Sequence, residues 1–300
     1  MSSDFPHDLA RLYSPRYVSE VLAAHGLRLK KSLGQNFLVD ANIVHKIVAA
    51  AAVTADDVVL EIGPGIGHLT AALVARAKHV IAVEIDERLI PILRALFADA
   101  RNLTILHADI TASPLSALSA AAGLPLTKVV ANIPYYITTP IISECAASRG
   151  VIRSATLTVQ SDALVRFTAA PGDKRYSILA VLMRYWGRLR TCGAVPASCF
   201  FPRPEVDSTI VQIEPFPQPP VHLSDEALFT RLVRTAFQQR RKMLRNSLEP
   251  FATDGYALAE ALRAADIADS VRPEQLALED YARLANALAA VAPARAEMVQ

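Results

Sequence analysis

An amide, a proline and an aromatic ring lie close together at Asn132, Ile133, Pro134 and Tyr135. They follow the apolar run 129–131, which predicts a buried strand, and open α/β sheets bind ligands at the carboxyl ends of strands. Proline fixes its own φ and disfavours a helical Ile133, so the Ile133 carbonyl and the Asn132 side-chain oxygen can point the same way. Two acceptors beside a flat ring suit a planar base with an exocyclic amine. The alternative is a plain strand end whose tyrosine covers the core.

A glycine turn forms a second candidate site. Residues 58–62 predict a strand and residues 68–75 a helix, and glycines alternate in the turn 63–67 between them. Glycine lets the backbone adopt positive φ and approach a ligand closely, and strand, glycine turn and helix together form the usual nucleotide-binding arrangement. The spacing differs from the G-x-G-x-x-G of dinucleotide enzymes. Glu61, just before the turn, suits a ligand with a cationic end.

Acidic residues follow the next two predicted strands. Glu84 follows the strand 80–83, about 20 residues after the glycine turn, where an acid can bind both ribose hydroxyls. Asp109 follows the strand 103–107 and is placed to accept a hydrogen bond from an adenine amino group. Either acid alone could be a solvated loop residue or a helix cap, but together they favour a nucleoside site.

Two loops could complete such a site. Residues 30–38 are basic, then glycine-hinged, then amide-rich, which predicts an irregular loop that either folds over a cofactor or serves as a surface linker. Asp40 is placed to cap the helix 41–51. Residues 199–206 hold two prolines that keep the loop extended and could present Phe200 as a second stacking surface.

The order of the remaining elements predicts an α/β domain followed by a helical one. Further helices are expected at 87–98, 113–122, 138–148 and 162–169, strands at 155–160 and 207–213, and a helix-to-strand transition of undefined position in 176–190. Four prolines in 215–220 indicate a linker, after which only helices are expected, at 225–248, 256–265 and 278–290. We therefore predict an extension (1–27), a Rossmann-like sheet domain with helices on both faces (28–214), the linker (215–220) and a small all-α C-terminal domain (221–300).

Cations gather on the first of these C-terminal helices. The spacing of three, seven and four residues puts Arg231, Arg234, Arg241 and Arg245 on one helix face, which Arg240 and Lys242 widen. Such a face suits a phosphate backbone. The alternative, an ordinary solvated face, is the usual outcome for charge runs.

Composition excludes several other classes of protein. The chain has 300 residues, is 52% hydrophobic and carries a net charge of only +2, so nucleic-acid affinity must come from local patches. Three cysteines without C-x-x-C spacing indicate reduced thiols in a cytosolic protein. No signal peptide, membrane span or metal site is expected, and we expect a monomer.

Several of these motifs together resemble a known family, the ribosomal RNA adenine N6-dimethyltransferases, which use S-adenosylmethionine. The motifs occur in family order: 35–38 (Gln-Asn-Phe-Leu), 61–65 (Glu-Ile-Gly-Pro-Gly), 84–86 (Glu-Ile-Asp), Asp109, 132–135 and 200–208. Residues 236–242 and 245–248 resemble the branch acting on the small ribosomal subunit. The resemblance implies dimethylation at N6 of two adjacent adenosines in the 3′-terminal hairpin of the small-subunit RNA, during maturation of that subunit.

The resemblance also implies roles for particular residues. Methionine-moiety contacts are expected from Asn36, Leu38 and Gly63, ribose contact from Glu84, adenine contact from Asp109 and substrate-amine contact from Asn132. The complete expected cofactor set is Gln35, Asn36, Leu38, Gly63, Gly65, Glu84, Ile85, Asp109, Ile110 and Asn132. The expected catalytic set is Asn132, Ile133, Pro134, Tyr135 and Phe200, and the expected RNA-binding set is Arg240, Arg241, Lys242 and Arg245. The family gives no role to residues 1–27. The sequence departs from the family at Ser161, Asp162 and Ser177.

Three alternative functions remain. A non-enzymatic ribosome-assembly or transcription factor could keep the fold, but the intact glycine turn, Glu84, Asp109 and Asn132 argue against it. A large-subunit RNA methylase resembles the catalytic half but lacks the C-terminal signature. DNA adenine methylases usually carry a second proline where Ile133 stands.

Overall fold

The computed structural model describes residues 9–27, 35–133, 137–148, 150–253 and 256–291. The chain forms two compact units, one of residues 1–164 and 188–215 and the other of residues 165–187 and 216–300. The segment 165–187, expected in the sheet domain, therefore groups with the helical residues. Its helix α8 (Ile178–Trp186) is buried along nearly its whole length and contacts the helices α9 (Glu226–Gln238) and α13 (Leu278–Ala290) of that unit.

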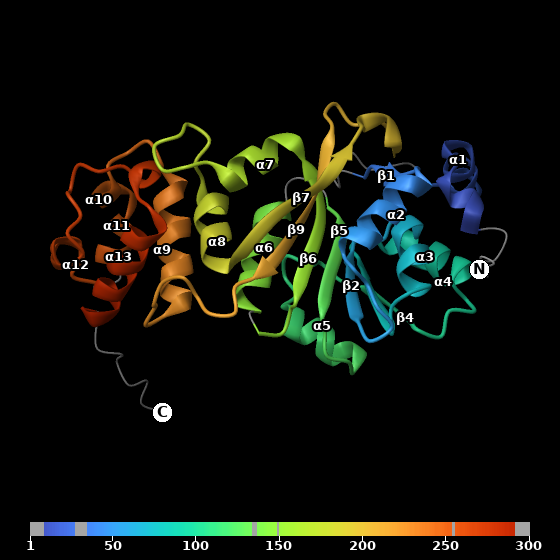
Figure 1. The fold of residues 1–300 in the computed structure, drawn as a ribbon, viewed down its shortest axis with the longest axis horizontal. Coiled ribbons are helices and arrows are strands. Elements are labelled where there is room, and N and C mark those ends of the chain that lie inside the picture. The colour runs from blue at the N-terminus through green and yellow to red at the C-terminus, as the bar shows by residue number, and fades with distance from the viewer. Residues whose placement is uncertain (1–8, 28–34, 134–136, 149, 254–255, 292–300) are drawn as a thin grey trace. The chain divides into compact units, whose positions relative to one another are not determined.

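The first unit contains a seven-stranded sheet in the order β4-β3-β2-β5-β6-β9-β7. Its strands are β2 (Val58–Ile62), β3 (His79–Glu84), β4 (Leu103–His107), β5 (Lys128–Asn132), β6 (Ser154–Gln160), β7 (Gly187–Val195) and β9 (Ser208–Pro215). Strands β2 to β6 pair in parallel, and β9 pairs antiparallel with β6 (Figure 1). The predicted Rossmann-like α/β sheet is confirmed.

Helices cover both faces of this sheet. Val59, Val80 and Val130 pack with α2 (Ala41–Ala50) and α3 (His68–Val74) on one face. Alternate side chains of a strand point to opposite faces, and the intervening Leu60 and Ile81 are fully buried as well. This unit also contains α4 (Ile90–Leu96), α5 (Leu115–Ala122) and α6 (Thr138–Ala147), and the division between the two units falls within α7 (Ser161–Thr168). Burial on both faces explains why these strands are continuous apolar runs.

The direction of the chain through the sheet sets the place for a ligand. From β2 the chain continues outward to β3 and β4 and then returns to β5, which pairs with β2 on its other side. The carboxyl ends of β2 and β5 therefore lie at a topological switch point, where open α/β sheets leave a crevice.

A small two-stranded sheet joins two distant motifs. β1 (Phe37–Leu38) pairs antiparallel with β8 (Phe200–Phe201), so that Leu38 lies opposite Phe200. The Val39 amide also donates to the Cys199 carbonyl at 2.8 Å. The expectation that residues 30–38 contain no strand is wrong at Phe37 and Leu38, because an edge partner about 160 residues away supplies their hydrogen bonds.

The N-terminal extension packs behind the glycine turn. It forms a short 3-10 helix (Leu9–Tyr13) and α1 (Pro15–Ala24), which begins at the proline. Leu12 and Val18 are fully buried in a cluster with Ile66, from the turn, and residues of α4. The Tyr13 hydroxyl donates to the His68 carbonyl at 3.1 Å, so the extension contacts the first residue of α3.

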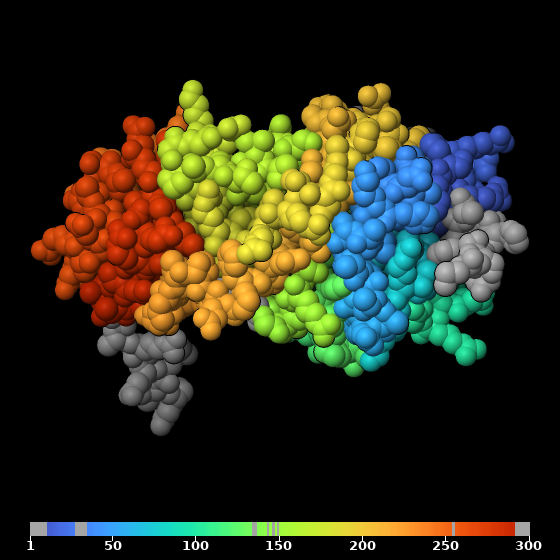
Figure 2. Space-filling view, in the orientation of Figure 1, coloured from blue at the N-terminus to red at the C-terminus, as the bar shows by residue number. Residues whose placement is uncertain are grey.

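A lysine side chain of α2 lies against one residue of the edge strand β7. A Cβ placed at Gly193 would lie 3.2 Å from Lys46 Cδ, so the Lys46 stem of α2 lies against the strand. Figure 2 shows the blue segment that contains α2 beside the yellow segment of β7.

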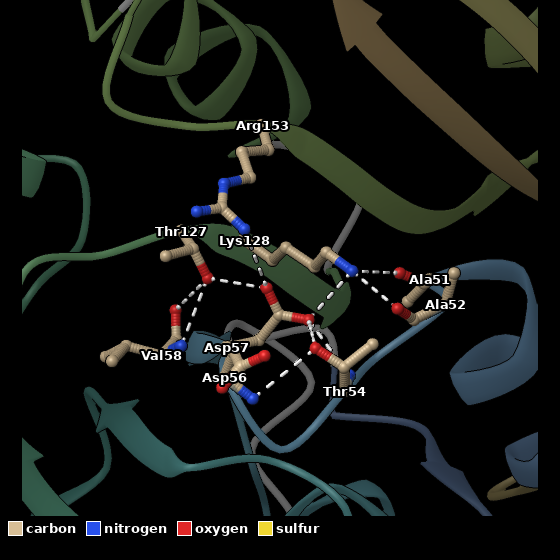
Figure 3. Close-up of polar contacts among 9 residues, drawn as sticks. All are labelled: Ala51, Ala52, Thr54, Asp56, Asp57, Val58, Thr127, Lys128 and Arg153. Carbon is tan, nitrogen blue, oxygen red and sulfur yellow. Dashed lines mark hydrogen bonds and ion pairs between the residues drawn. The ribbon is translucent and has the colours of Figure 1, made fainter.

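A buried ion-pair cluster ties together the amino ends of β2, β5 and β6 (Figure 3). Asp57 is 1% exposed, and its carboxyl binds Lys128 Nζ at 2.9 Å and accepts from the Thr127 hydroxyl at 3.0 Å. Thr54 adds its amide and hydroxyl to the same carboxyl. Burial by itself would raise the pKa of Asp57, but these hydrogen bonds, led by that from Lys128, lower it. The cluster lies at the sheet end opposite the switch point and therefore serves stability.

The second unit is helical. Besides α8, α9 and α13 it contains α10 (Leu244–Ser247), α11 (Glu249–Thr253), α12 (Leu258–Ala264) and a 3-10 turn (Pro273–Gln275). Its core holds Tyr176 and Tyr281, whose hydroxyls donate to the Leu276 and Pro273 carbonyls at 2.9 and 2.8 Å. The Phe237 ring contacts both tyrosine rings.

The single helix expected at 225–248 is wrong, because α9 ends at Gln238. The Ser247 hydroxyl donates to the Gln239 carbonyl at 3.1 Å, and the Leu244 amide donates to the Val271 carbonyl at 2.7 Å. These bonds replace the hydrogen bonds of a continuous helix, and Leu244 and Leu248 are buried. The six cations therefore do not share one helix face.

Candidate active site

A pocket in the first unit lies at the carboxyl ends of β2, β3, β4 and β5. It brings together every residue of the expected cofactor set, which comprises Gln35, Asn36, Leu38, Gly63, Gly65, Glu84, Ile85, Asp109, Ile110 and Asn132. Ile133 and Phe200 of the expected catalytic set also line it, whereas Pro134 and Tyr135 lie outside the described residues. The parallel sheet explains this convergence, because all four strands end at the same edge.

The glycine turn forms the floor of this pocket. Gly65 has φ +62°, and a Cβ there would lie 2.7 Å from the Phe37 ring. At Gly67, φ is +94° and a Cβ would lie 2.3 Å from the Phe97 ring. Both positions therefore need glycine for conformation as well as for space.

Glu84 is held by the backbone at the end of β3. Its two carboxyl oxygens accept hydrogen bonds from the Gly65 amide at 3.1 Å and from the Asp86 amide at 2.9 Å. The side chain is 5% exposed, and burial raises its pKa. The carboxyl is thus fixed at the junction of the glycine turn and the second strand.

Asp86, which had no role of its own among the expected site residues, connects the N-terminal loop to this junction. It accepts hydrogen bonds from Arg88 at 2.7 and 2.6 Å and from Gln35 Nε2 at 3.0 Å. These bonds, led by that from Arg88, lower the pKa of Asp86 to about 2. The charged Asp86 therefore anchors Gln35, and its place two residues after Glu84 was the signal in the sequence.

The far side of the pocket combines acidic and apolar groups. Asp109 Oδ1 accepts from the Thr111 amide at 2.8 Å and from its hydroxyl at 2.7 Å. Ile85 is 43% exposed, which is unusual for a large apolar side chain, and Ile110 is half-buried beside Asp109. Exposed apolar surface at a pocket indicates a ligand with an apolar face.

Asn132 connects the end of β5 to the N-terminal loop. Its Nδ2 donates to the Asn36 carbonyl at 3.1 Å, and the following Ile133 is 3% exposed. Phe200, 5% exposed, reaches the pocket wall through its pairing with Leu38. Residues from three regions of the sequence therefore meet around Asn132.

Two buried polar side chains of the pocket have an atom without a hydrogen-bond partner among the described residues. Glu61 is 1% exposed with Oε2 unpartnered, and burial raises its pKa to about 8. His68, which no sequence motif singled out, is 3% exposed with Nε2 unpartnered, and burial lowers its pKa to about 4. Its ring stacks on Phe37, with centroids 5.8 Å apart. Its position as the first residue of the helix after the glycine turn was the signal for it.

The expected RNA-binding residues lie in the second unit. Residues 238–243 are all exposed, and Arg240, Arg241 and Lys242 belong to this exposed turn after α9. Arg240 donates a hydrogen bond to the Lys174 carbonyl at 3.0 Å. Arg245 forms an exposed ion pair with Asp269, with 3.6 Å between Nη1 and Oδ2. Arg231 instead lies over the Phe251 ring at 4.5 Å, so it packs within the helical unit.

The described part of the chain shows neither of two other classes of site. Its helices are all too short or too polar to cross a bilayer. Within the same residues, no cluster of histidine, cysteine or acidic side chains is arranged to hold a metal ion.

Residues 26–290 match the family described as "Ribosomal RNA adenine dimethylase". Curated relatives named ribosomal RNA small subunit methyltransferase A include that of Geobacillus thermodenitrificans, 42% identical over 92% of this chain and 96% of the relative. The relative of the same name from Geobacillus sp. strain WCH70 is 40% identical over 92% of this chain and 97% of the relative.

Solved structures agree with these matches. A dimethyladenosine transferase from Plasmodium falciparum is 26% identical, with a TM-score of 0.63, over 82% of this chain and 94% of that one. The 23S rRNA methyltransferase ErmE is 28% identical, with a TM-score of 0.55, over 85% and 100%.

Proposed function

Since this chain belongs to the ribosomal RNA adenine dimethylase family, we propose that it transfers methyl groups from S-adenosylmethionine to adenine N6 in the RNA of the small ribosomal subunit. The observation that carries this proposal is the meeting of Asn132 with the glycine turn, Glu84 and Asp109 around one pocket at the switch point of the sheet. The product is an N6,N6-dimethyladenosine at each of two adjacent positions in the 3′-terminal hairpin.

The pocket fits the cofactor on chemical grounds. Its buried Glu61 oxygen without a partner among the described residues and its further acids suit a positively charged ligand, and Ile85 and Ile110 suit the faces of an adenine. Glu84 would hold the ribose hydroxyls, Asp109 the adenine amine, and Asn36, Leu38 and Gly63 the methionine moiety. When bound, S-adenosylmethionine supplies a methyl group carried by a positively charged sulfur.

The protein's own part in the reaction is to orient the target amine. The N6 lone pair of adenine is delocalised into the ring and is a poor nucleophile. Asn132 Oδ1 and the Ile133 carbonyl accept the N6–H groups and thereby localise the lone pair toward the methyl donor. The N6 proton leaves to solvent after alkylation, when the amine has become acidic, so no strong base is required. A monomethylated amine keeps one N–H and can bind for the second transfer.

RNA recognition is assigned to the second unit. An adenosine must leave its stack to enter the pocket, and one base cannot identify one site in a large RNA. The remaining recognition comes from phosphate contacts of Arg240, Arg241, Lys242 and Arg245. These residues belong to the C-terminal signature, which favours the RNA of the small subunit as substrate over that of the large subunit. The enzyme then acts as a monomer on small subunits in the cytoplasm.

Methylation of purified particles tests this proposal. Small subunits from a strain that lacks the modification are incubated with the protein and methyl-labelled cofactor, and the modified nucleotides are mapped. Two adjacent dimethyladenosines are expected. Label on large-subunit RNA alone, or no label despite cofactor binding, contradicts the proposal.

A further inference from the structure

Glu61 stands apart from the other acids of the pocket. The carboxyls of Glu84, Asp86 and Asp109 each accept hydrogen bonds from backbone amides or side chains. Glu61 is more deeply buried than any of them, and its Oε2 has no partner within the described part of the chain. Hydrogen bonding from Thr70, in the first turn of α3, lowers the pKa of Glu61 in part, but no described group bonds Oε2.

The described groups that face Glu61 do not supply a balancing cation. Glu84, from β3, adds negative charge, and Tyr13, from the N-terminal 3-10 helix, has its pKa raised by burial and by Glu61. His68, in the same pocket, stays neutral near pH 7 because burial lowers its pKa to about 4. An ionised Glu61 would therefore be a buried, unpaired charge, which proteins avoid by keeping the group protonated.

We propose that Glu61 is protonated in the free protein and releases this proton to solvent when a cationic group of the cofactor enters the pocket. No other bond is made or broken in this step: the carboxylic acid becomes a carboxylate, and the cofactor's positive charge replaces the proton. The inference rests on the proposed function, because S-adenosylmethionine brings two cations, the sulfonium and the α-ammonium. Glu61 thereby becomes a residue that selects a charged cofactor over neutral adenosine analogues.

Calorimetry of the full-length wild-type protein decides the question without RNA. S-adenosylmethionine is titrated at pH 7 in buffers of different ionisation enthalpy, and the dependence of the measured heat on the buffer gives the number of protons released. With the Glu61 pKa at about 8, about 0.9 proton per cofactor is expected. Affinity is expected to rise by up to about tenfold per pH unit from pH 6 and to level off above pH 8, because binding needs the ionised form.

Ligands that differ in charge identify the cation. S-adenosylhomocysteine keeps the ammonium but not the sulfonium, and 5′-methylthioadenosine has neither. Proton release with S-adenosylmethionine but not with S-adenosylhomocysteine identifies the sulfonium as the cation that replaces the proton. Release with both of these ligands identifies the ammonium. Equal release with methylthioadenosine overturns the proposal, because that ligand is neutral.

Variants locate the released proton. Glu61→Gln keeps the shape of the side chain and is expected to abolish both the proton release and the rise of affinity with pH. Glu84→Gln is the matched variant, since the Glu84 pKa is also raised by burial. It is expected to bind the cofactor more weakly but, at saturating cofactor, to release the same number of protons per cofactor bound. Proton release per cofactor bound that persists in Glu61→Gln overturns the proposal.

The wild-type titration keeps the test decisive if Glu61→Gln does not fold, which its melting curve reveals. Tight cofactor binding and normal methylation without proton release overturn this inference alone. A protein that neither binds the cofactor nor methylates RNA overturns the proposed function together with it.

Discussion

Asn132 donates a hydrogen bond from Nδ2 to the backbone carbonyl of Asn36 at 3.1 Å, although 96 residues separate the two. A carbonyl oxygen only accepts hydrogen bonds, so this contact fixes which way the amide of Asn132 is turned. Oδ1 is left as the acceptor for an incoming amine. The same bond attaches the N-terminal loop to the end of β5, so that cofactor and substrate groups are positioned by one side chain.

Replacing Asn132 separates binding from turnover. Asn132→Ala is expected to lower the single-turnover methylation rate by about a hundred- to a thousandfold, the usual effect of removing one oriented polar group. Cofactor affinity should change much less. Asn132→Asp keeps an acceptor but cannot donate to Asn36, so it should not restore the rate. Parental rates in either variant would contradict the role given to Asn132.

Removal of the Glu84 carboxyl should weaken cofactor binding. Glu84→Ala loses hydrogen bonds to a charged group, which contribute about 1.5–3 kcal/mol, so calorimetry should show roughly ten- to a hundredfold lower affinity. Glu87→Ala is the control, because Glu87 is an exposed acid three residues away. Equal affinities of both variants and the parent would exclude Glu84 from the site.

The Asp57 cluster should matter for stability rather than for catalysis. Asp57→Ala removes the only carboxylate that the described residues place against Lys128 Nζ, which is 12% exposed and keeps only the Ala51 and Ala52 carbonyls. Breaking a buried pair typically costs about 3–5 kcal/mol of unfolding free energy. The exposed neighbour Asp56 provides the control, since surface changes usually stay within about 0.5 kcal/mol. Denaturant unfolding measures both variants. A destabilisation in Asp57→Ala no larger than that in Asp56→Ala would show that the cluster adds little.

The same cluster predicts a pH dependence. The pKa of Asp57 is lower in the folded protein than in the unfolded chain, so its stabilisation is present above the ordinary carboxyl value. It disappears as pH falls through the folded value. Unfolding free energies measured between pH 7 and 3 should therefore fall less steeply in Asp57→Asn than in the parent. Parallel curves would contradict the prediction.

The exposed turn after α9 should govern affinity for the ribosome. Alanine at Arg240, Arg241 and Lys242 should leave cofactor binding intact and weaken binding to small subunits. In a plot of the logarithm of the binding constant against the logarithm of the salt concentration, the slope should become less steep by about 0.7–0.9 for each phosphate that the variant no longer neutralises. Arg231→Ala offers a contrast, because Arg231 packs on Phe251 and its removal should lower the melting temperature. A folded triple variant with parental affinity and slope would refute the assignment.

The elements around the pocket were predictable from sequence because their signals are local. The strands at 58–62 and 103–107 form over the predicted residues. In the second unit, away from the pocket residues, the helix at 278–290 does so as well. Parallel strands that are buried on both faces appear in the sequence as short apolar runs bounded by turn residues. Asp40 caps α2, as its position before the helix predicts. Strand ends in one parallel sheet must meet, so the convergence of Glu84, Asp109 and Asn132 followed as well.

Tertiary structure alone decided the contacts between distant residues. The bonds from Asn132 to Asn36 and from Gln35 to Asp86, and the pairing of β1 with β8, join segments that no local pattern relates. The end of α9 is set by the hydrogen bonds from Ser247 to the Gln239 carbonyl and from Leu244 to the Val271 carbonyl. The helical periodicity of residues 225–248 gives no sign of either contact. The charge state of Glu61 likewise depends on its burial: residue type and spacing give the carboxyl, but only the surrounding fold removes water from it.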